Sequence, residues 1–123
     1  MDFDALSNRV IGCAIEVHRE LGPGLLESAY AKCLAYELSQ AGIGFKLQQE
    51  LPVRYKGLKL DCGYRIDVLV QDALILELKS IDTILGIHEA QLLTYMKLAD
   101  IKTGLLINFN VRLLKSGIKR FVL

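Results

Sequence analysis

The chain has 123 residues, enough for one domain, and we treat residues 1–123 as a single unit because no linker, repeat or low-complexity stretch divides it. Hydrophobic residues make up 52% of the chain and charged residues 24%, which excludes a disordered, strongly acidic or collagen-like protein. Fifteen lysines and arginines against fourteen acids give a net charge of +1, which argues neither for nor against a polyanionic partner.

Two helices are predicted before any strand. Apolar residues recur at helical spacing through Asp4–Leu21, and the cluster Gly22-Pro23-Gly24 ends that helix. The second helix has an apolar stripe over Leu26–Ala41, and Gly42 stands where a left-handed cap is wanted. Within that stripe, we expect Tyr30 to pack in the core with its hydroxyl bonded locally.

The hydrophobic period then changes to two. Phe45–Tyr55 alternates apolar and polar side chains, and Pro52 marks this segment as an edge strand or a bulge. Lys56-Gly57 predicts a tight turn into the next strand. Further strands are predicted at residues 58–62, 64–70 and 73–79. The last of these, ALILELK, is apolar enough to lie at the centre of a sheet.

A third helix and two strands complete the chain. Helical spacing covers Ile87–Ala99, with an apolar side that includes Ala90, Leu93, Met96 and Leu98. Residues 104–109 predict a buried strand, and residues 118–123 predict a short last strand. This order of elements predicts an α/β protein in which helices flank a mixed β-sheet.

Positive charge is concentrated near the C-terminus. Residues 101–123 contain no acid and five cations, which are Lys102, Arg112, Lys115, Lys119 and Arg120. Such a segment can lie beside phosphates, or it can be the solvated edge of a sheet, where lysine discourages edge-to-edge pairing. Both interpretations stay open at this point.

The cysteines and the N-terminus indicate a compartment. Cys13, Cys33 and Cys62 form no C-x-x-C pair and are odd in number, which is typical of a reducing environment and not of a disulfide framework or a zinc site. The first residues, MDFDALSNRV, include acids where a signal peptide carries basic residues, and no apolar run approaches the ~20 residues that span a bilayer. We therefore expect a soluble, cytoplasmic protein.

The segment over residues 67–79 holds the strongest candidates for chemistry. Glu77 and Lys79 are two apart on one strand, so their side chains share a face. Asp67 joins that face only if residue 70 pairs with residue 74 across a three-residue loop, because a two-residue turn would put Asp67 on the opposite face. The hypothesis of a shared site therefore requires the three-residue loop.

Two carboxylates and an ammonium on one patch suit a metal centre. Carboxylate oxygens held close together favour a hard divalent cation such as Mg²⁺, which can polarise a phosphoryl oxygen and activate water. A neighbouring lysine can orient that water or stabilise developing charge. The alternative is that Glu77 and Lys79 form the solvated face of a half-buried strand and pair across it with Asp67 and Arg65.

The helices offer further polar candidates. Gln91 and Tyr95 are four apart and share one helix face, where they need hydrogen-bond partners if buried. They can equally face solvent. His88 precedes them by about one turn, and a lone histidine is more often structural than functional. Glu27 falls in the first turn of the second helix, where the helix dipole favours an acid in any case.

These residues, in this order, resemble a known family. Gly24, Glu27 and Tyr30 match the G-x-x-E-x-x-Y signature of the GxxExxY proteins. Asp67 with Glu77-Leu78-Lys79 resembles the D…(D/E)-x-K core of the PD-(D/E)XK nuclease superfamily, with Ile66 in place of the proline. The segment Gln91–Tyr95 is similar to the Q-x-x-x-Y helix element of its RecB-like branch. The resemblance covers nearly the whole chain.

The resemblance implies a restriction-endonuclease-like fold and a metal site. On that basis Asp67 and Glu77 would bind Mg²⁺ or Mn²⁺ together with the main-chain carbonyl of Leu78. Glu27, as the acidic residue of the N-terminal helix, would lie close to the metal as a further ligand.

The implied activity is metal-dependent hydrolysis of phosphodiester bonds in nucleic acid, with DNA favoured over RNA. Lys79 would position the attacking water, and Gln91 and Tyr95 would brace the site or contact a phosphate. The competing class is a non-catalytic module that keeps the nuclease fold and binds nucleic acid or protein, which the near-neutral charge favours. A hydrolase of small phosphorylated molecules is a third hypothesis, and a homo-oligomer is left open.

Overall fold

The computed structural model describes residues 3–123. In chain order its elements are α1 (Ala5–Leu21), α2 (Glu27–Gln40), β1 (Phe45–Glu50), β2 (Val53–Tyr55), β3 (Leu58–Leu60), β4 (Arg65–Val70), β5 (Leu74–Lys79), α3 (Gly86–Ala99), β6 (Thr103–Asn108), the 3₁₀ turn η1 (Leu114–Gly117) and β7 (Ile118–Val122). Within this described range, no helix combines the length and the apolar character needed to cross a membrane.

Five of the strands form one mixed sheet. Their order is β1-β4-β5-β6-β7, with β5 and β6 parallel and every other neighbouring pair antiparallel. The predicted central position of ALILELK is confirmed, because β5 has neighbours on both sides. A parallel pair needs a crossover connection, and α3 provides it between β5 and β6.

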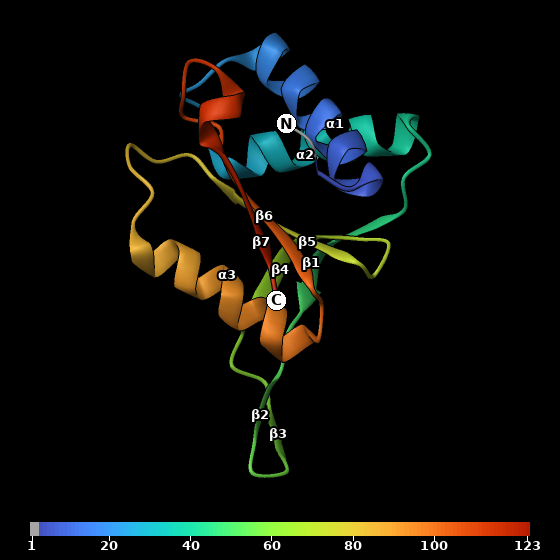
Figure 1. Cartoon of the computed structure of the whole chain (residues 1–123), viewed down its shortest axis with the longest axis vertical. Coiled ribbons are helices and arrows are strands. Elements are labelled where there is room, and N and C mark those ends of the chain that lie inside the picture. Colours follow the sequence, from blue (N-terminus) through green and yellow to red (C-terminus); the bar gives the residue numbers. More distant parts are fainter. Residues whose placement is uncertain (1–2) are drawn as a thin grey trace.

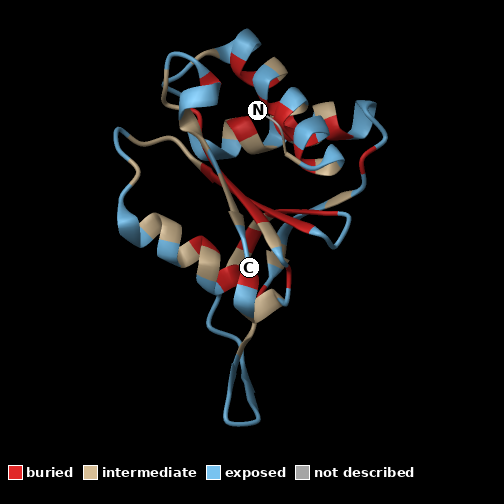
Figure 2. Cartoon of the chain, viewed as in Figure 1, coloured by how far each residue is buried: buried red, intermediate tan, exposed pale blue. Residues whose placement is uncertain are grey.

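Helices cover both faces of this sheet (Figure 1). One core lies under α1 and α2 and includes the sheet residues Val68, Leu76 and Leu105. A second core lies under α3 and includes the sheet residues Leu69, Ile75 and Leu106. Figure 2 shows the buried residues along the sheet and on the helix sides that face it. The predicted α/β class, with helices flanking a mixed sheet, is confirmed.

The strand predicted over Phe45–Tyr55 is in fact two strands. β1 ends at Glu50, Leu51 is buried in the second core, and the chain restarts as β2 at Val53. Pro52 has no N–H to continue a ladder, which explains the break. β2 pairs only with β3, across the Lys56-Gly57 turn, so the two strands form a separate hairpin.

The buried side of α3 differs from the predicted one. Leu92, Tyr95 and Met96 are buried, whereas Ala90 is exposed and Leu93 and Leu98 only flank the second core. Apolar residues occur around the whole helix, so spacing alone does not select a side. The contact surface decides instead.

Gly104 of β6 is the position on the sheet that α3 contacts. A Cβ at this position would lie 2.7 Å from the Met96 sulfur and 3.0 Å from a Leu92 methyl carbon. The missing side chain therefore lets Leu92 and Met96 pack directly on the sheet.

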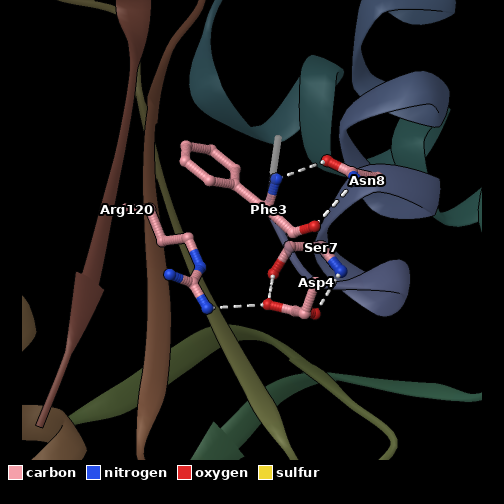
Figure 3. A network of polar contacts seen from close by, with 5 residues as sticks. All are labelled: Phe3, Asp4, Ser7, Asn8 and Arg120. Carbon is pink, nitrogen blue, oxygen red and sulfur yellow. Dashed lines mark hydrogen bonds and ion pairs between the residues drawn. The ribbon is translucent and has the colours of Figure 1, made fainter. Parts of the chain in front are cut away.

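The start of α1 is held against the edge strand β7 (Figure 3). Asp4 caps the helix by accepting a hydrogen bond of 2.8 Å from the Ser7 N–H. Its second oxygen lies 2.9 Å from the Arg120 guanidinium, which stacks over the Phe3 ring at 5.2 Å. Lys119 likewise pairs with Glu89 at 2.9 Å. These two cations of the basic segment thus form ion pairs from the edge strand β7 to the neighbouring helical segments.

Candidate active site

Strands β4 and β5 separate at the position of the candidate acids. Their ladder pairs Val70 with Leu74 across a three-residue loop and ends where Val68 pairs with Leu76. The predicted loop and register are therefore confirmed, and the next step along the strands brings Asp67 opposite Glu77. β5 continues beyond this point against β6 alone, as far as Lys79. The backbone of β5 is thus left without a partner strand on its β4 side.

The Asp67 carboxylate takes the place of the missing strand. Its Oδ2 accepts a hydrogen bond of 2.9 Å from the Leu78 N–H. In a β-strand the N–H and C=O of one residue point to the same side, so the Leu78 carbonyl is also directed at the gap. One side-chain oxygen and one main-chain oxygen therefore lie at the point where the strands part.

Glu77 is the most perturbed acid of the site. It is only 5% exposed, and its Oε1 is buried without a hydrogen-bond partner. Burial, and then the negative charge of Asp67, raise the pKa of Glu77 from 4.5 to about 8, while the Lys79 charge acts in the opposite direction. An unpaired carboxylate in the interior is costly unless a proton or a cation neutralises it.

Asp67 shares this electrostatic environment. Burial raises its pKa above the usual value, and the negative charge of Glu27 adds to the rise. The Leu78 N–H and the Lys79 charge partly offset these effects. The Asp67 charge thus raises the pKa of Glu77, and the Lys79 charge lowers the pKa of both acids, as expected for charges gathered in one place.

A small pocket of about 190 Å³ opens beside Asp67 on the α2 side. Glu27 lines it from the first turn of α2, where the sequence predicts it, and Gln48 lines it from β1. Gln48 has a φ of +52° and falls opposite Asp67 in the β1–β4 register, where its polar side chain lowers the pKa of that carboxyl. Nothing in the sequence distinguishes Gln48 from the other polar residues of an alternating strand, so it is not among the predicted site residues.

The Gln91–Tyr95 pair approaches the acids from α3. Gln91 donates a hydrogen bond of 3.1 Å to the Tyr95 hydroxyl, and Tyr95 is nearly buried. Burial raises the pKa of Tyr95, and the negative charges of Glu77 and Asp67 contribute to the rise. Tyr95 is buried in the second core against the sheet, and Gln91 is half-buried beside it, so the pair does not lie on the fully solvated face of α3. Its role in the site stays a prediction.

Two other sequence candidates have structural roles. Tyr30 is fully buried, donates to the Gly22 carbonyl at 2.6 Å, and stacks on Phe109 with ring centroids 4.3 Å apart. The expected core role is confirmed. His88 accepts a hydrogen bond of 2.9 Å from the Leu85 N–H through Nδ1, which caps the start of α3.

The donor set suits a hard divalent cation. Glu77 Oε1 is an oxygen without a partner, and Asp67 and the Leu78 carbonyl lie at the same gap. Mg²⁺ takes oxygen ligands and keeps several waters, so one or two carboxylates are sufficient protein ligands. Within residues 3–123, no cluster of three or more Asp, Glu, His or Cys side chains is placed to hold a metal. That Glu27 joins the two acids as a further ligand stays a prediction.

Comparison with known proteins agrees with this geometry. A family model described as the PD-(D/E)XK nuclease superfamily matches residues 4–121. No curated protein and no solved structure matches the chain. The match spans nearly the whole chain and includes the parted strands with Asp67, Glu77 and Lys79. The chain therefore belongs to the PD-(D/E)XK nuclease superfamily.

Proposed function

We propose that this protein is a Mg²⁺- or Mn²⁺-dependent nuclease that hydrolyses phosphodiester bonds of DNA. One observation carries the proposal: two facing carboxylates, one of them with an unpartnered buried oxygen, occupy the gap between β4 and β5. In a chain of nuclease ancestry, such a pair has a direct use as a cation site.

The metal ligands in this proposal are Asp67, Glu77 and the Leu78 carbonyl. When bound there, the cation supplies positive charge that polarises a phosphoryl oxygen and lowers the pKa of a water. The Leu78 N–H fixes the Asp67 carboxylate by a 2.9 Å hydrogen bond, so this ligand is oriented before any metal arrives. Glu27 contributes negative charge from the α2 side, close to the metal.

Lys79 and the α3 pair act on the substrate side of the reaction. The ammonium of Lys79 orients the attacking water and stabilises the charge that develops on the phosphate. Gln91 holds the Tyr95 hydroxyl at 3.1 Å, and this pair braces the acids or touches a phosphate. Glu27, Asp67, Glu77, Lys79, Gln91 and Tyr95 are thus the proposed catalytic group.

Finer assignments belong to the same proposal. We propose that the chain belongs to the GxxExxY branch, which its G-x-x-E-x-x-Y residues support, and that it is related to RecB-like nucleases, which Gln91–Tyr95 supports. We propose a cytoplasmic protein, since Cys13, Cys33 and Cys62 are all free thiols and a reducing compartment keeps them so.

A cleavage assay tests the proposal. Purified protein is incubated with single-stranded, duplex and branched DNA and with RNA, with Mg²⁺, with Mn²⁺ or with EDTA. We expect metal-dependent cleavage of DNA, lost in Asp67→Asn and in Glu77→Gln. The asparagine introduced by the first variant keeps an oxygen that can accept from the Leu78 N–H, so the local hydrogen bond is retained.

Asp72→Asn is the matched control. Asp72 is an acid in the same β4–β5 loop, but its side chain is 76% exposed and distant from the metal ligands in the register. This variant should cleave like the wild type. Retained DNA binding without cleavage of any substrate by the wild type would support the non-catalytic module instead.

A further inference from the structure

The β2–β3 hairpin is the least supported part of the fold. It projects from the body of the molecule (Figure 1), and Figure 2 shows it exposed except at its base, where Val53 is partly buried. It forms its own two-stranded sheet, and such isolated hairpins are only marginally stable in water. A projecting hairpin of this kind gains stability when it binds something.

The two faces of the hairpin differ in chemistry. Val53 pairs with Leu60 and Tyr55 with Leu58, so one face is apolar although Tyr55 is 56% exposed. The opposite face carries two cations, from the remaining pair Arg54 and Lys59. Lys56 lies at the turn, with its ammonium 5.4 Å from the centre of the Tyr55 ring. Exposed aromatic surface therefore lies directly beside positive charge.

A groove connects this hairpin to the candidate active site. A cavity of about 520 Å³ lies between Val53 at the base of the hairpin and α3. Tyr64 lines it with a half-exposed ring, which meets the Tyr95 ring edge-on at 5.9 Å. Gln91 and Tyr95 form its far wall. The groove thus runs from Val53, on the apolar face of the hairpin, to the Gln91–Tyr95 pair of α3.

We propose that this groove, together with the hairpin beside it, holds unpaired nucleotides of the substrate next to the bond that is cut. Bases stack on Tyr64 in the groove and on Tyr55 of the hairpin, while Lys56 at the turn and the Arg54–Lys59 pair on the other hairpin face contact the phosphates of the strand that leaves the groove. The inference rests on the proposed nuclease function and adds a substrate form: DNA with a single-stranded segment, preferred over continuous duplex.

The chemistry of the groove selects this occupant. An unpaired strand presents flat base surfaces and negative phosphates together, which match the tyrosines and the cations of one hairpin. In a duplex the bases are stacked inside, so the apolar face would lie against phosphates. Tyr95 of the groove wall also packs in one core cluster with Ile66, the neighbour of Asp67, and with Ile75, two residues before Glu77, so a strand in the groove lies near these acids.

A binding assay tests the inference. Fluorescence anisotropy measures the affinity for a labelled single strand of about 20 nucleotides and for the duplex of the same sequence, in EDTA to prevent cleavage. The wild type should bind the single strand more tightly. Tyr55→Ala should weaken single-strand binding by about fivefold or more, whereas Tyr55→Phe, which keeps the ring, should bind like the wild type.

The cations are tested by salt dependence. The slope of log affinity against log salt should be less steep by roughly 1.4 in the double variant Arg54→Ala with Lys59→Ala. This is the change expected when two phosphate contacts to a single strand are lost. Two exposed controls match these variants: Tyr36→Ala on α2, and Arg112→Ala with Lys115→Ala near η1. Both controls should retain wild-type binding and salt dependence.

The outcomes separate this inference from the nuclease proposal. If the wild type cleaves DNA but the hairpin variants bind single strands like the controls, the groove assignment is wrong and the nuclease stands. If Tyr55→Ala instead changes the sedimentation of the protein and leaves DNA binding intact, a protein occupies the groove and the inference fails. If hairpin variants lose single-strand binding while no substrate is cleaved, the groove assignment stands and the nuclease proposal fails.

Discussion

The Leu78 main chain, at the point where two strands separate, shows how the site is built residue by residue. Its N–H loses a strand partner and gains the Asp67 carboxylate at 2.9 Å. This bond fixes one acid in the gap, and the register then brings Glu77 opposite it. Burial of the two acids then raises the pKa of each, so that both resist ionisation.

The stability of the metal-free protein should depend on Glu77. Its pKa is about 8 in the folded protein and near 4.5 when unfolded, so the folded state holds the proton more tightly between these values. The free energy of unfolding should therefore fall as pH rises from about 4.5 to about 8, by several kcal/mol at most. Urea unfolding in EDTA at a series of pH values measures this.

Glu77→Gln provides the comparison for the pH series. The amide cannot ionise, so the fall in stability over this window should largely disappear. An equally steep fall in Glu77→Gln would show that another group causes the pH dependence.

Lys79 should matter more for turnover than the α3 pair. Lys79→Ala should keep the fold and metal binding but reduce the cleavage rate on the order of a hundredfold, since one preorganised charge is lost. Gln91→Ala should have a milder effect, and Tyr95→Phe the mildest, because the ring still packs. Single-turnover kinetics measure all three.

The control for Lys79 is Lys46→Ala, a strand lysine whose side chain is 61% exposed. It should cleave at the wild-type rate. Equal losses in the Lys46 and Lys79 variants would remove the specific role of Lys79 and indicate a general effect of positive charge.

At the scale of elements, a glycine determines how α3 sits on the sheet. Gly104→Ala would place a Cβ 2.7 Å from the Met96 sulfur and 3.0 Å from a Leu92 methyl carbon, so these buried side chains must be displaced and the packing of α3 on the sheet is disturbed. We expect a loss of about 1–3 kcal/mol in the free energy of unfolding. Because Tyr95 lies on the same helix, cleavage should fall as well. Urea unfolding and the cleavage assay measure the two effects.

Gly12→Ala is the matched control for this substitution. Gly12 lies inside α1, where an added Cβ meets nothing within 4 Å. It should stabilise the protein by up to about 1 kcal/mol, because alanine is the better helix former. A destabilised Gly12→Ala together with an unaffected Gly104→Ala would contradict the packing described for α3.

The elements themselves were largely predictable, and the exceptions have identifiable causes. Helical spacing located α1 and α3 within one residue at each end. It could not select the buried side of α3, since that depends on Gly104 of a strand distant in sequence. The alternating pattern predicted one strand where β1 and β2 are separate. The pattern reflects only which side chains are apolar, and the break follows from the missing N–H of Pro52.

At the scale of the whole molecule, the site joins two layers that face opposite sides of the sheet. Glu27 comes from the α2 layer and Tyr95 from the α3 layer, and both interact electrostatically with Asp67. Motif spacing predicted Asp67, Glu77 and Lys79, since a strand and its register are local features. Gln48 could not be predicted, because its role arises from a left-handed backbone on a neighbouring strand.

The central claim is that Asp67 and Glu77 bind a divalent cation that relieves their mutual repulsion. Calorimetric titration of Mn²⁺ into the wild type and into Asp67→Asn, at a pH above 8, tests it most directly. We predict one binding event in the wild type and none in the variant, whose metal-free form should also unfold at a higher temperature. Equal Mn²⁺ binding by the two proteins would contradict the account, because these acids would then not be the ligands.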